Sequence, residues 1–492
     1  MTRRLSNATL SQFPSTVAVP RYDRSKVRTG IVHLGIGAFH RAHQAVYTDD
    51  VLEHDPSWGI VAASLRSPDT QDALAPQDGL YAVSVRSDGG ELLRIVGSIS
   101  RVILAPQEPD ELMASLTDPK TRIVTLTVTE KGYCHDPATG DLDERHPDII
   151  HDLAHQYRPK SAPGLIVEAL RRRREAGIAP FTVLTCDNLP SNGRTVHRIL
   201  SRYASLVDRD LGAFVAGEVA CPSTMVDRIV PATTDDDRAR IAAVLGVRDA
   251  WPVVTEPFTQ WVIEDHFPQG RPAWEKAGAE FVTDVEPFEQ MKLRLLNGSH
   301  STLAYLGFLA GYETVSSAMG DPAFERLLRD MMDLEVTPTL HMPEGADLHS
   351  YKKALIERFK NPALKHRTGQ IAMDGSQKLP QRLLGTIRDR LQAGGGIDRL
   401  ALGVAAWMRY ATGVDESGRA IDVRDPMVAR LRSLADSAAG EPELLVHGLF
   451  GIREIFGDDL PANPAFTGPV KSALTQLFRD GARKTVAHYP VS

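Results

Sequence analysis

Four short, β-branched runs in the first half of the chain constrain its fold most strongly, because strands buried on both faces of a sheet carry almost no charge. They are residues 30–35, 59–65, 122–128 and 180–186. Segments with apolar residues at helical spacing lie between them, among them residues 40–52 and 164–177. Strands that alternate with helices in this way predict an α/β fold, with helices on both faces of a mostly parallel sheet.

In the second half of the chain, helical periodicity replaces the strand-like runs, and this change marks an expected domain boundary. At 492 residues the chain is longer than one hydrophobic core supports, because cores stop growing at about 250 to 300 residues. Segments with helical periodicity follow at residues 289–309, 324–335, 399–413 and 470–482. The sequence therefore predicts an α/β domain over residues 1–286 and a mainly α-helical domain over residues 287–492.

Composition and charge exclude several classes of function. The 56 basic and 63 acidic residues give a formal charge of -7, which disfavours binding to nucleic acid. No apolar run approaches the roughly 18 residues of a membrane helix, and residues 1–17 lack the apolar centre of a signal peptide. The three cysteines form no C-x-x-C pair, so neither a disulfide framework nor a zinc site is indicated. We therefore expect a cytoplasmic protein without metal, nucleic-acid or membrane partners, as a monomer or a weak homo-oligomer.

The segment GIGAFHRAHQ, residues 35–44, begins like a dinucleotide-binding loop and then departs from it. Gly35 and Gly37 stand between an expected strand and an expected helix, as in G-x-G-x-x-G, but His40 replaces the third glycine. The third glycine packs the helix on the strand, so its loss need not abolish cofactor binding. Arg41 is expected near the phosphates. The alternative is a plain glycine turn with a surface arginine, and the motif alone leaves the two open.

The end of the next expected strand, LRSPD at residues 65–69, bears on the choice of cofactor. Asp69 would favour NAD by repelling the additional phosphate of NADP, whereas Arg66 could accommodate that phosphate. These residues alone therefore leave NAD and NADP open. The candidate cofactor-binding residues are Gly35, Ile36, Gly37, Phe39, His40, Arg41, Arg66 and Asp69.

Polar side chains also follow the two remaining expected strands. Glu130 and Lys131 come just after the third strand, and Asp187 and Asn188 come just after the fourth. Polar residues after a strand are usually turn formers, and this is the plainer interpretation for either segment alone. Because ligands gather at the carboxyl ends of parallel strands, two such ends beside a glycine loop favour a shared site.

The segment MKLRLLNGSH, residues 291–300, carries the strongest signal in the second half. On an α-helix with about 100° per residue, His300 falls at about 80° and Asn297 at about 140° from Lys292, so the three share one side over about 12 Å. A lysine, an amide and an imidazole together can take a proton, hold an oxyanion and orient a hydroxyl. The alternative is an amphipathic helix with Gly298 as a packing glycine. The apolar neighbours predict instead a largely buried helix, whose polar groups need partners that a substrate supplies.

Six motifs taken together resemble one family. They are GIGAFHRAHQ, TVTEKGYC, TCDNLPSNG, MVDRIVP, EPFTQWVIED and MKLRLLNGSH, and their order and spacing are similar to the polyol-specific long-chain dehydrogenases, the mannitol dehydrogenase family. The resemblance runs from about residue 28 to the C-terminus, with K-x-x-x-x-N-x-x-H as its most specific element. It implies a Rossmann-type N-terminal domain that binds NAD, a mostly helical C-terminal domain, and an active site between them that needs no metal.

The resemblance also implies roles for individual side chains. Lys292 resembles the general base that takes the alcohol proton while a hydride leaves for nicotinamide, and Asn188 and Asn297 resemble the amides that bind the developing alkoxide. Substrate positioning is implied for His300 and Asp227, and control of proton exit to solvent for Glu130. A non-catalytic NAD(H) sensor would be expected to have lost the lysine, asparagine and histidine trio, so an oxidoreductase is favoured.

The choice of substrate, an open-chain sugar acid or a polyol, depends on departures from the family pattern. Mannitol 2-dehydrogenases typically carry an arginine eight residues before the lysine of D-G-S-x-K, and a glycine after T-E. Here Gln370 stands at the first place, Arg367 comes slightly earlier, Lys378 is retained, and Lys131 follows Glu130. These departures resemble the fructuronate reductase (mannonate oxidoreductase) branch, and additional cations suit a carboxylate.

The segment LRSPD, in contrast, is closer to the mannitol and arabinitol branch. We therefore expect D-mannonate and D-fructuronate as the substrate pair, with D-mannitol and D-fructose, or a related polyol such as arabinitol, as the alternative. The candidate substrate-binding residues are Asp227, Lys378, Arg367 and Lys131.

Overall fold

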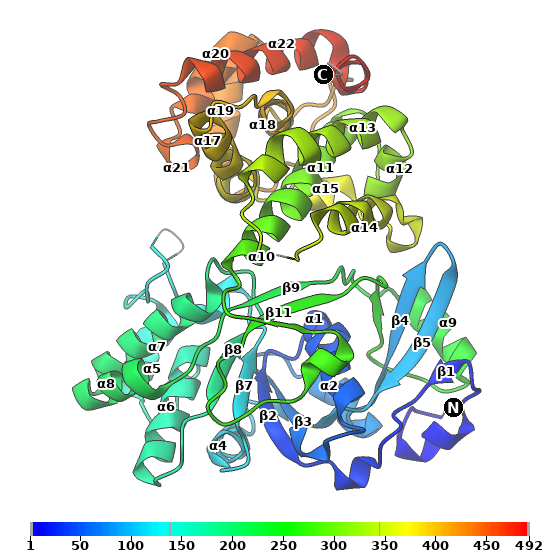
Figure 1. The fold of residues 1–492 in the computed structure, drawn as a ribbon, viewed down its shortest axis with the longest axis vertical. Coiled ribbons are helices and arrows are strands. Elements are labelled where there is room, and N and C mark those ends of the chain that lie inside the picture. Colours follow the sequence, from blue (N-terminus) through cyan, green and yellow to red (C-terminus); the bar gives the residue numbers. More distant parts are fainter. Residues whose placement is uncertain (1–2, 137–138, 344, 490–492) are drawn as a thin grey trace. The chain divides into compact units, whose positions relative to one another are not determined.

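The computed structural model describes residues 3–136, 139–343 and 345–489, and the chain forms two compact units, Met1–Glu286 and Pro287–Ser492 (Figure 1). The first unit is built around a parallel sheet with the spatial order β6-β3-β2-β7-β8. Its strands are β2 (Thr29–Leu34), β3 (Gly59–Ser64), β6 (Ile99–Leu104), β7 (Ile123–Leu126) and β8 (Thr182–Thr185). The strand order reverses between β2 and β7, which is where doubly wound sheets bind a nucleotide. The predicted α/β, Rossmann-type fold is confirmed.

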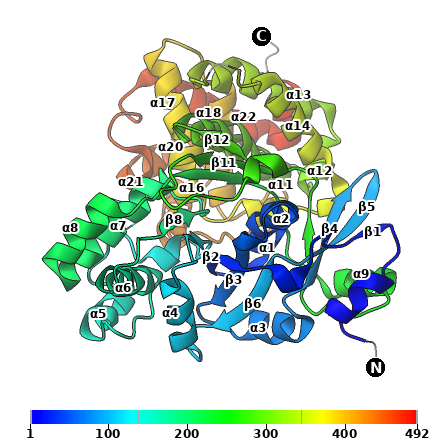
Figure 2. The ribbon, with the colours of Figure 1, turned by 60° about the horizontal axis from the view of Figure 1, so that its bottom comes forward.

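Successive side chains of β2 point to opposite faces of this sheet and enter two separate cores. Val32 and Leu34 belong to the core that α4 (Pro109–Thr117), α6 (Ala162–Glu175), α7 (Asn192–Val207) and α8 (Arg209–Glu218) cover. Figure 2 shows α5 (Pro147–Ala154), α6, α7 and α8 grouped on this side. Ile31 enters the other core, with the buried Trp261 and Trp274. Helices therefore cover both faces, as the uncharged strands predicted.

The predicted helix over residues 40–52 is interrupted. It consists of α1 (Ala38–Ala42) and α2 (Gln44–Val51), and the break falls at His43, whose backbone has φ -123° and ψ -92°. Tyr47 of α2 and the ring of His43 both pack on Trp261. Contacts with a tryptophan more than 200 positions away thus accompany a break that the local pattern did not indicate.

Two smaller sheets complete the first unit, and the sequence patterns did not predict them. An antiparallel hairpin of β4 (Tyr81–Ser87) and β5 (Gly90–Val96) is flanked by β10 and β1, while β9 and β12 lie on either side of β11. The bounds of the other strands are β1 (Val17–Ala18), β9 (Thr224–Asp227), β10 (Val253–Thr255), β11 (Gln260–Glu264) and β12 (Glu280–Val282). The remaining helices are α3 (Asp69–Leu74) and α9 (Asp235–Leu245), and the short 3-10 helices are η1 (Asn7–Gln12), η2 (Arg24–Lys26), η3 (Pro56–Trp58), η4 (Ala75–Gln77), η5 (Glu130–Tyr133) and η6 (Trp274–Ala277).

The second unit is mainly helical, as predicted, and is organised around the buried helix α18, which packs against α11 and α22. Its α-helices are α10 (Glu286–Met291), α11 (Ser299–Leu309), α12 (Val315–Met319), α13 (Pro322–Asp330), α14 (Leu348–Lys360), α15 (Thr368–Ile371), α16 (Gly375–Leu379), α17 (Gly385–Gln392), α18 (Asp398–Ala411), α19 (Val428–Ala438), α20 (Pro442–Phe450), α21 (Arg453–Phe456) and α22 (Pro464–Ala487). Three π-helices, η7 (Lys292–Gly298), η8 (Met331–Val336) and η11 (Pro380–Leu384), and two short 3-10 helices, η9 (Thr337–Thr339) and η10 (Pro362–Leu364), join them. In the described part of the chain, no helix has both the length and the apolar character that crossing a bilayer requires.

Candidate active site

The glycine loop at the end of β2 has one position that only glycine can occupy. Gly35 has φ +96°, and a Cβ added to it would lie 2.2 Å from the carbonyl oxygen of Thr127 on the neighbouring segment. Gly37 is different, because it is exposed and the nearest neighbour of a Cβ there would be the Gly35 carbonyl oxygen, at 3.8 Å. Gly35 therefore fixes the turn, while Gly37 leaves the backbone open to a ligand, as the first two glycines of a dinucleotide loop do.

His40 lies beneath this loop and not in it. Its buried ring stacks on that of His33, with the centroids 3.4 Å apart and the planes 9° from parallel. His33 Nδ1 contacts Thr125 Oγ1 at 2.7 Å, and its Nε2 contacts the Gly35 carbonyl at 3.1 Å and Thr127 Oγ1 at 3.0 Å. Burial lowers the pKa of His33 to about 3 and that of His40 well below its usual range, so both rings are neutral. The expected cofactor contact at His40 is replaced by a packing role.

Arg41 does not reach the loop surface either, contrary to the expectation. Its side chain is buried, lies over the Tyr81 ring at 5.4 Å, and donates to the carbonyls of Trp251 and Gly37. Burial lowers the pKa of Arg41 to about 10. The guanidinium thus ties α1 to the chain beside β10. Ile36 is also buried, while Phe39 is partly exposed and stacks on His43 with the ring centroids 5.0 Å apart.

The loop after β3 presents both of the residues that bear on cofactor choice. Arg66 and Asp69 are exposed just beyond the end of the strand at Ser64. Ser67 Oγ donates to Asp69 Oδ2 at 2.6 Å, which fixes the carboxylate at the start of α3. Either residue can therefore contact the adenosine ribose of a nucleotide bound at this edge of the sheet.

The loop after β7 carries Glu130 and Lys131, both exposed, and a partly buried carboxylate, that of Asp187, fastens it to the end of β8. Asp187 accepts hydrogen bonds from the backbone N–H groups of Val128 at 2.9 Å and Thr129 at 3.1 Å, and from the Tyr133 hydroxyl at 2.7 Å. Burial raises the pKa of the Asp187 carboxyl.

The backbone of this loop is strained at Thr129, whose φ of +64° is unusual for a β-branched residue. Such strain persists only where surrounding contacts enforce it, and the hydrogen bond to Asp187 is one of them. From the sequence, Asp187 was recognised only as a polar residue after a strand. Its neighbour Asn188 is exposed, and Asp227 is buried at the end of β9.

In the second unit the K-x-x-x-x-N-x-x-H segment is not a continuous α-helix. Lys292 begins the π-helix η7, Asn297 lies near its end, and His300 lies in the first turn of α11. A π-helix has about 4.4 residues per turn because it bonds residue i to residue i+5, so Lys292 and Asn297 fall one turn apart on the same side. The expected α-helical angles are corrected accordingly. Lys292 is 9% exposed and Asn297 is partly buried.

His300 sits among aromatic and cationic side chains. Its ring stacks on Phe359 with centroids 5.4 Å apart and meets His366 edge-on at 4.7 Å. Its Nε2 has no hydrogen-bond partner within the described ranges. Burial, together with the nearby charges of His366, Arg382, Arg358 and Lys378, lowers the pKa of His300 well below its usual range. The imidazole is therefore neutral, and its buried Nε2 is available to a ligand.

The other predicted residues of this unit have different surroundings. Lys378 Nζ donates to the Met373 carbonyl at 2.6 Å and lies close enough to His300 for its charge to be felt there. Arg367, by contrast, is exposed at the start of α15 and pairs with Glu313 at 3.7 Å. The structure brings Lys378 together with His300 and leaves Arg367 on the surface.

Arg382, which lies four residues after Lys378 on η11, was not among the predicted residues. Its Nη1 donates to Ser301 Oγ at 3.0 Å, one position beyond His300. A Cβ added to Gly298 would lie 2.8 Å from the Arg382 carbonyl oxygen, so η7 and η11 are in close contact. Gly298 is thus a packing glycine that permits this approach. The contact with Ser301 joins segments 81 positions apart, so no spacing within the sequence indicated it.

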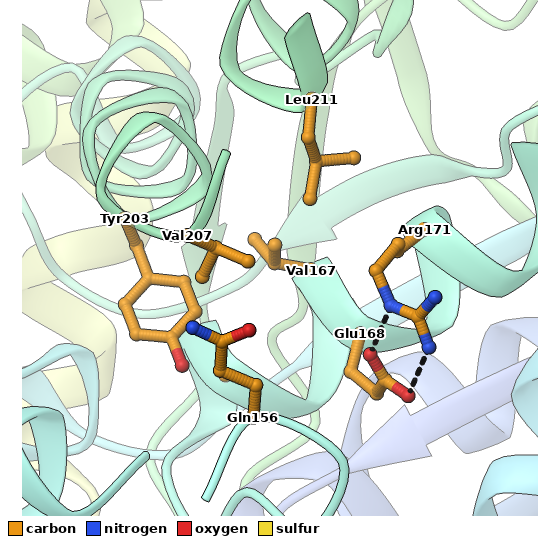
Figure 3. Close-up of a pocket in the computed structure, with 8 residues that line it drawn as sticks. Gln156, Val167, Glu168, Arg171, Tyr203, Val207 and Leu211 are labelled. Carbon is orange, nitrogen blue, oxygen red and sulfur yellow. Dashed lines mark hydrogen bonds and ion pairs between the residues drawn. The ribbon is translucent and has the colours of Figure 1, made fainter. Parts of the chain in front are cut away.

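Two other features of the first unit do not coincide with the predicted residues. A small pocket lined by Val167, Tyr203 and the ion pair of Glu168 with Arg171 lies among α6, α7 and α8 (Figure 3). Cys134, His146 and Asp148 form the one group in the described part of the chain that could hold a metal. His146 Nδ1 already accepts the Asp148 N–H at 3.2 Å as the cap of α5, which accounts for this cluster structurally.

Family models match both units. A mannitol dehydrogenase Rossmann domain matches residues 29–276, and a mannitol dehydrogenase C-terminal domain matches residues 284–478. The chain belongs to the mannitol dehydrogenase family. The predicted family is therefore confirmed, and its Rossmann and C-terminal domains account for the two kinds of architecture in the chain.

Relatives within the mannitol dehydrogenase family cover almost the whole chain. The D-mannonate oxidoreductase of Escherichia coli (strain K12) is 50% identical over 476 residues, which is 96% of this chain and 98% of that protein. The mannitol 2-dehydrogenase of Phaeosphaeria nodorum (strain SN15) is 41% identical over 495 residues, or 99% of this chain and 86% of that protein. Among solved structures, the ternary complex of Pseudomonas fluorescens mannitol 2-dehydrogenase with NAD and D-mannitol superimposes with a TM-score of 0.87 at 41% identity, covering 99% of each chain.

Proposed function

We propose that this chain is an NAD(H)-dependent dehydrogenase that interconverts a secondary alcohol of an open-chain sugar acid with the matching ketone, with D-mannonate and D-fructuronate as the favoured pair. The observation that carries the proposal is the π-helix that aligns the buried Lys292 with Asn297, followed by the neutral His300. Relatives named D-mannonate oxidoreductase and mannitol 2-dehydrogenase support this class of reaction.

The first unit has residues that fit a dinucleotide at the end of β2. The exposed backbone of Gly37 and the turn at Gly35 suit a pyrophosphate, and Arg66 and Asp69 suit the adenosine ribose. Asp69 favours NAD, and Arg66 leaves NADP as the alternative. Bound NAD supplies a nicotinamide that takes up or returns a hydride.

The remaining chemistry falls to side chains of the protein. Lys292 takes the hydroxyl proton in the oxidative direction and returns it in the reductive direction. Asn297 and Asn188 donate amide N–H groups to the oxygen as negative charge develops on it. One π-turn separates Lys292 from Asn297, so the base and this oxyanion donor can serve the same oxygen.

Three further side chains are proposed to position the substrate or move protons. The neutral ring of His300 has one donor and one acceptor nitrogen, so it can orient a substrate hydroxyl. Asp227 binds a second hydroxyl through its carboxylate. Glu130, exposed on η5, exchanges the proton with solvent.

A lysine substitution tests the reaction class. Lys292→Ala should lower kcat by at least about 1000-fold, because general acid–base catalysis contributes on this scale. NADH binding, measured by fluorescence titration, should change little. Lys471→Ala removes an exposed lysine of α22 and serves as the control. Turnover of Lys292→Ala at the rate of the control would refute the assignment.

A comparison of ketoses tests the substrate class. NADH and NADPH oxidation should be measured side by side with D-fructuronate, D-tagaturonate, D-fructose and D-xylulose. The proposal predicts the highest kcat/KM with D-fructuronate. Turnover of D-fructose with none of either keturonate would instead establish the second candidate, a mannitol 2-dehydrogenase or related polyol dehydrogenase, which the 41% identity to a mannitol 2-dehydrogenase favours.

A further inference from the structure

The buried side chain of Asn192, at the start of α7, joins two segments that carry proposed substrate contacts. One is the turn after β8, which carries Asn188, and the other is β9, which ends at Asp227. Asn192 belongs to the motif TCDNLPSNG, but no step of the proposed reaction uses it. Its side chain is only 2% exposed, so the amide depends on partners within the protein.

The hydrogen bonds of the Asn192 amide are divided between the turn and the strand. Nδ2 donates to the carbonyl of Asp187, the residue before Asn188, at 3.0 Å, and to the carbonyl of Thr224, the first residue of β9, at 2.9 Å. Oδ1 accepts the Thr224 N–H at 2.9 Å. Bonds of this length from one planar group fix the turn and the strand relative to each other.

The backbone beside Asn192 packs at the same junction. A Cβ added to Gly193 would lie 2.4 Å from the Cys221 carbonyl oxygen and 2.5 Å from the Ser223 nitrogen, so only glycine lets α7 begin this close to the segment that leads into β9. The Thr224 hydroxyl also donates to the carbonyl of Thr185, the last residue of β8, at 2.7 Å. A helix start and two strand ends thus meet here, and such elements place functional groups more precisely than loops do.

The turn that Asn192 closes is strained, so it needs these contacts. Ser191 has φ +43° and ψ +55°, in the left-handed region that residues other than glycine and asparagine rarely adopt. The Thr195 hydroxyl donates to the Pro190 carbonyl at 2.9 Å and supports the same turn. A strained backbone relaxes when the bonds that enforce it are removed, so loss of the Asn192 amide should displace Asn188.

We propose that Asn192 is a positioning residue for the reaction: it holds the amide of Asn188 and the carboxylate of Asp227 at the separation that the substrate requires. This inference rests on the proposed function, which assigns the alkoxide contact to Asn188 and a hydroxyl contact to Asp227. Asn192 acts through these two groups, because its own amide is buried and bonded to the protein. An oxyanion donor stabilises the transition state only if it is already in place when the charge develops.

A double-mutant cycle tests the proposal, with kcat measured with NADH and the ketose that the enzyme reduces fastest. Asn192→Ala should lower kcat about 10- to 100-fold through misplacement of the donor, and change KM for NADH by less than about threefold. In an Asn188→Ala background the same substitution should lower kcat by less than about threefold, because the amide that it positions is already absent. The KM for the ketose should still rise there, since Asp227 is displaced as well. Asn192→Ser, whose hydroxyl can keep one of the bonds, should give an intermediate kcat.

Gln77→Ala is the matched control, because Gln77 is also a fully buried side-chain amide of the first unit. Its Nε2 donates to the Leu80 carbonyl at 3.0 Å and to Asp249 Oδ1 at 2.9 Å, and its Oε1 accepts the Ala250 N–H at 2.7 Å. Gln77→Ala should lower the Tm about as much as Asn192→Ala but leave kcat within about twofold of wild type. A similar fall in kcat in the control would overturn the inference, because general loosening of the unit would then explain both variants.

Two results of the cycle itself would also overturn the inference. An equal fall in kcat in the wild-type and Asn188→Ala backgrounds would show that Asn192 is merely structural, while the proposed role of Asn188 would stand. Wild-type kcat in Asn188→Ala would instead remove the proposed role of Asn188, and the inference with it.

Hydrogen exchange followed by mass spectrometry separates this inference from the proposed function. In Asn192→Ala, residues 186–191 and 222–227 should both exchange faster than in the wild type, while residues 78–82 should be unchanged. Gln77→Ala should give the reverse pattern. If no ketose is reduced but both segments exchange faster, the proposed reaction fails and the positioning of the two segments stands. If a ketose is reduced and only one segment or neither responds, the inference fails and the reaction stands.

Discussion

His33 and His40 stack face to face with their ring centroids 3.4 Å apart, directly under the turn at Gly35. The pair explains why a histidine replaces the third glycine of the dinucleotide motif. A third glycine allows a helix to lie close on a strand, whereas here an imidazole fills the space between them and packs on a partner from β2. His33 in turn contacts the Gly35 carbonyl, so the stacked rings support the loop from below.

Buried neutral histidines make the stability of the first unit depend on pH. The pKa of His33 is lowered to about 3, and that of His40 also lies well below the value of about 6.5 in an unfolded chain. As the pH falls below about 6.5, the unfolded chain binds protons that the folded protein does not, so the free energy of unfolding decreases by up to about 1.4 kcal/mol per pH unit for each ring. Urea unfolding followed by tryptophan fluorescence should show this decrease between pH 7.5 and pH 5.

The variant His40→Phe isolates one of the two rings. It keeps an aromatic group on His33 but removes the titrating nitrogens, so the pH dependence should become shallower by about the contribution of one histidine. His54→Gln, at an exposed histidine of the same unit, is the matched control. An unchanged slope in His40→Phe would contradict the prediction.

Alanine substitutions at the two glycines of the loop after β2 should have different effects. Gly35→Ala places a methyl group 2.2 Å from the Thr127 carbonyl at a φ of +96°, so the Tm should fall and NADH binding should be lost with it. Gly37→Ala makes only an ordinary contact of 3.8 Å with the Gly35 carbonyl, so the Tm should be nearly unchanged while NADH binds at least about tenfold more weakly. Thermal melts and NADH titrations of both variants distinguish a loss of stability from a loss of contact with the ligand. Normal NADH binding by Gly37→Ala would count against a dinucleotide at this loop.

The contact between η7 and η11 should be sensitive to a single methyl group. Gly298→Ala forces apart the backbone at Arg382, because the new Cβ would lie 2.8 Å from its carbonyl oxygen. We expect a loss of about 1 to 3 kcal/mol in the free energy of unfolding and a fall in kcat, since Asn297 and His300 flank this position. Gly468→Ala in α22, where a Cβ meets nothing within 4 Å, should be neutral or slightly stabilising. Equal stabilities of the two variants would argue against a close contact.

Asp187 should prove essential to the loop after β7 without contacting substrate itself. Asp187→Ala leaves the N–H groups of Val128 and Thr129 without their acceptor, which should cost about 1 to 3 kcal/mol. The release of Thr129 from its φ of +64° should also displace Glu130 and lower kcat more than it raises KM for NADH. Asp235→Ala removes an exposed carboxylate that pairs with Arg238 and serves as the control. It should change the free energy of unfolding by less than about 1 kcal/mol and leave kcat nearly unchanged. Wild-type stability in Asp187→Ala would refute the role of Asp187 in holding the loop after β7.

The sequence predicted what depends on local patterns and missed what depends on distant contacts. The uncharged runs identified β2, β3, β7 and β8, because a strand that is buried on both faces has a nearly continuous run of apolar residues. The hairpin of β4 and β5 escaped notice although Asp88 and Gly89 form a recognisable two-residue link between them. Its strands, YAVSVRS and GELLRIV, mix apolar with charged or polar residues without a regular alternation, so neither gives a clear strand signal.

The same distinction between local patterns and distant contacts applies to individual residues of the candidate site. Gly35 was identified correctly as a turn residue from its motif. Arg41 was expected at the phosphates, but a carbonyl at Trp251, 210 positions away, receives its guanidinium in the protein core. Arg382 was overlooked because its proximity to His300 arises from packing between two π-helices, and no spacing within either segment reveals that contact.

The π-helix η7 has a consequence for how this family can change during evolution. A π-turn is an α-helix that contains one additional residue, so deletion of one residue between Lys292 and Asn297 would restore the more favourable backbone bonding. The same deletion would place the lysine and the amide four residues apart on an α-helix, at about 40° from one another and so still on one face. The five-residue interval and the π-turn therefore belong together: a descendant that keeps the lysine and the amide aligned either keeps both or loses both.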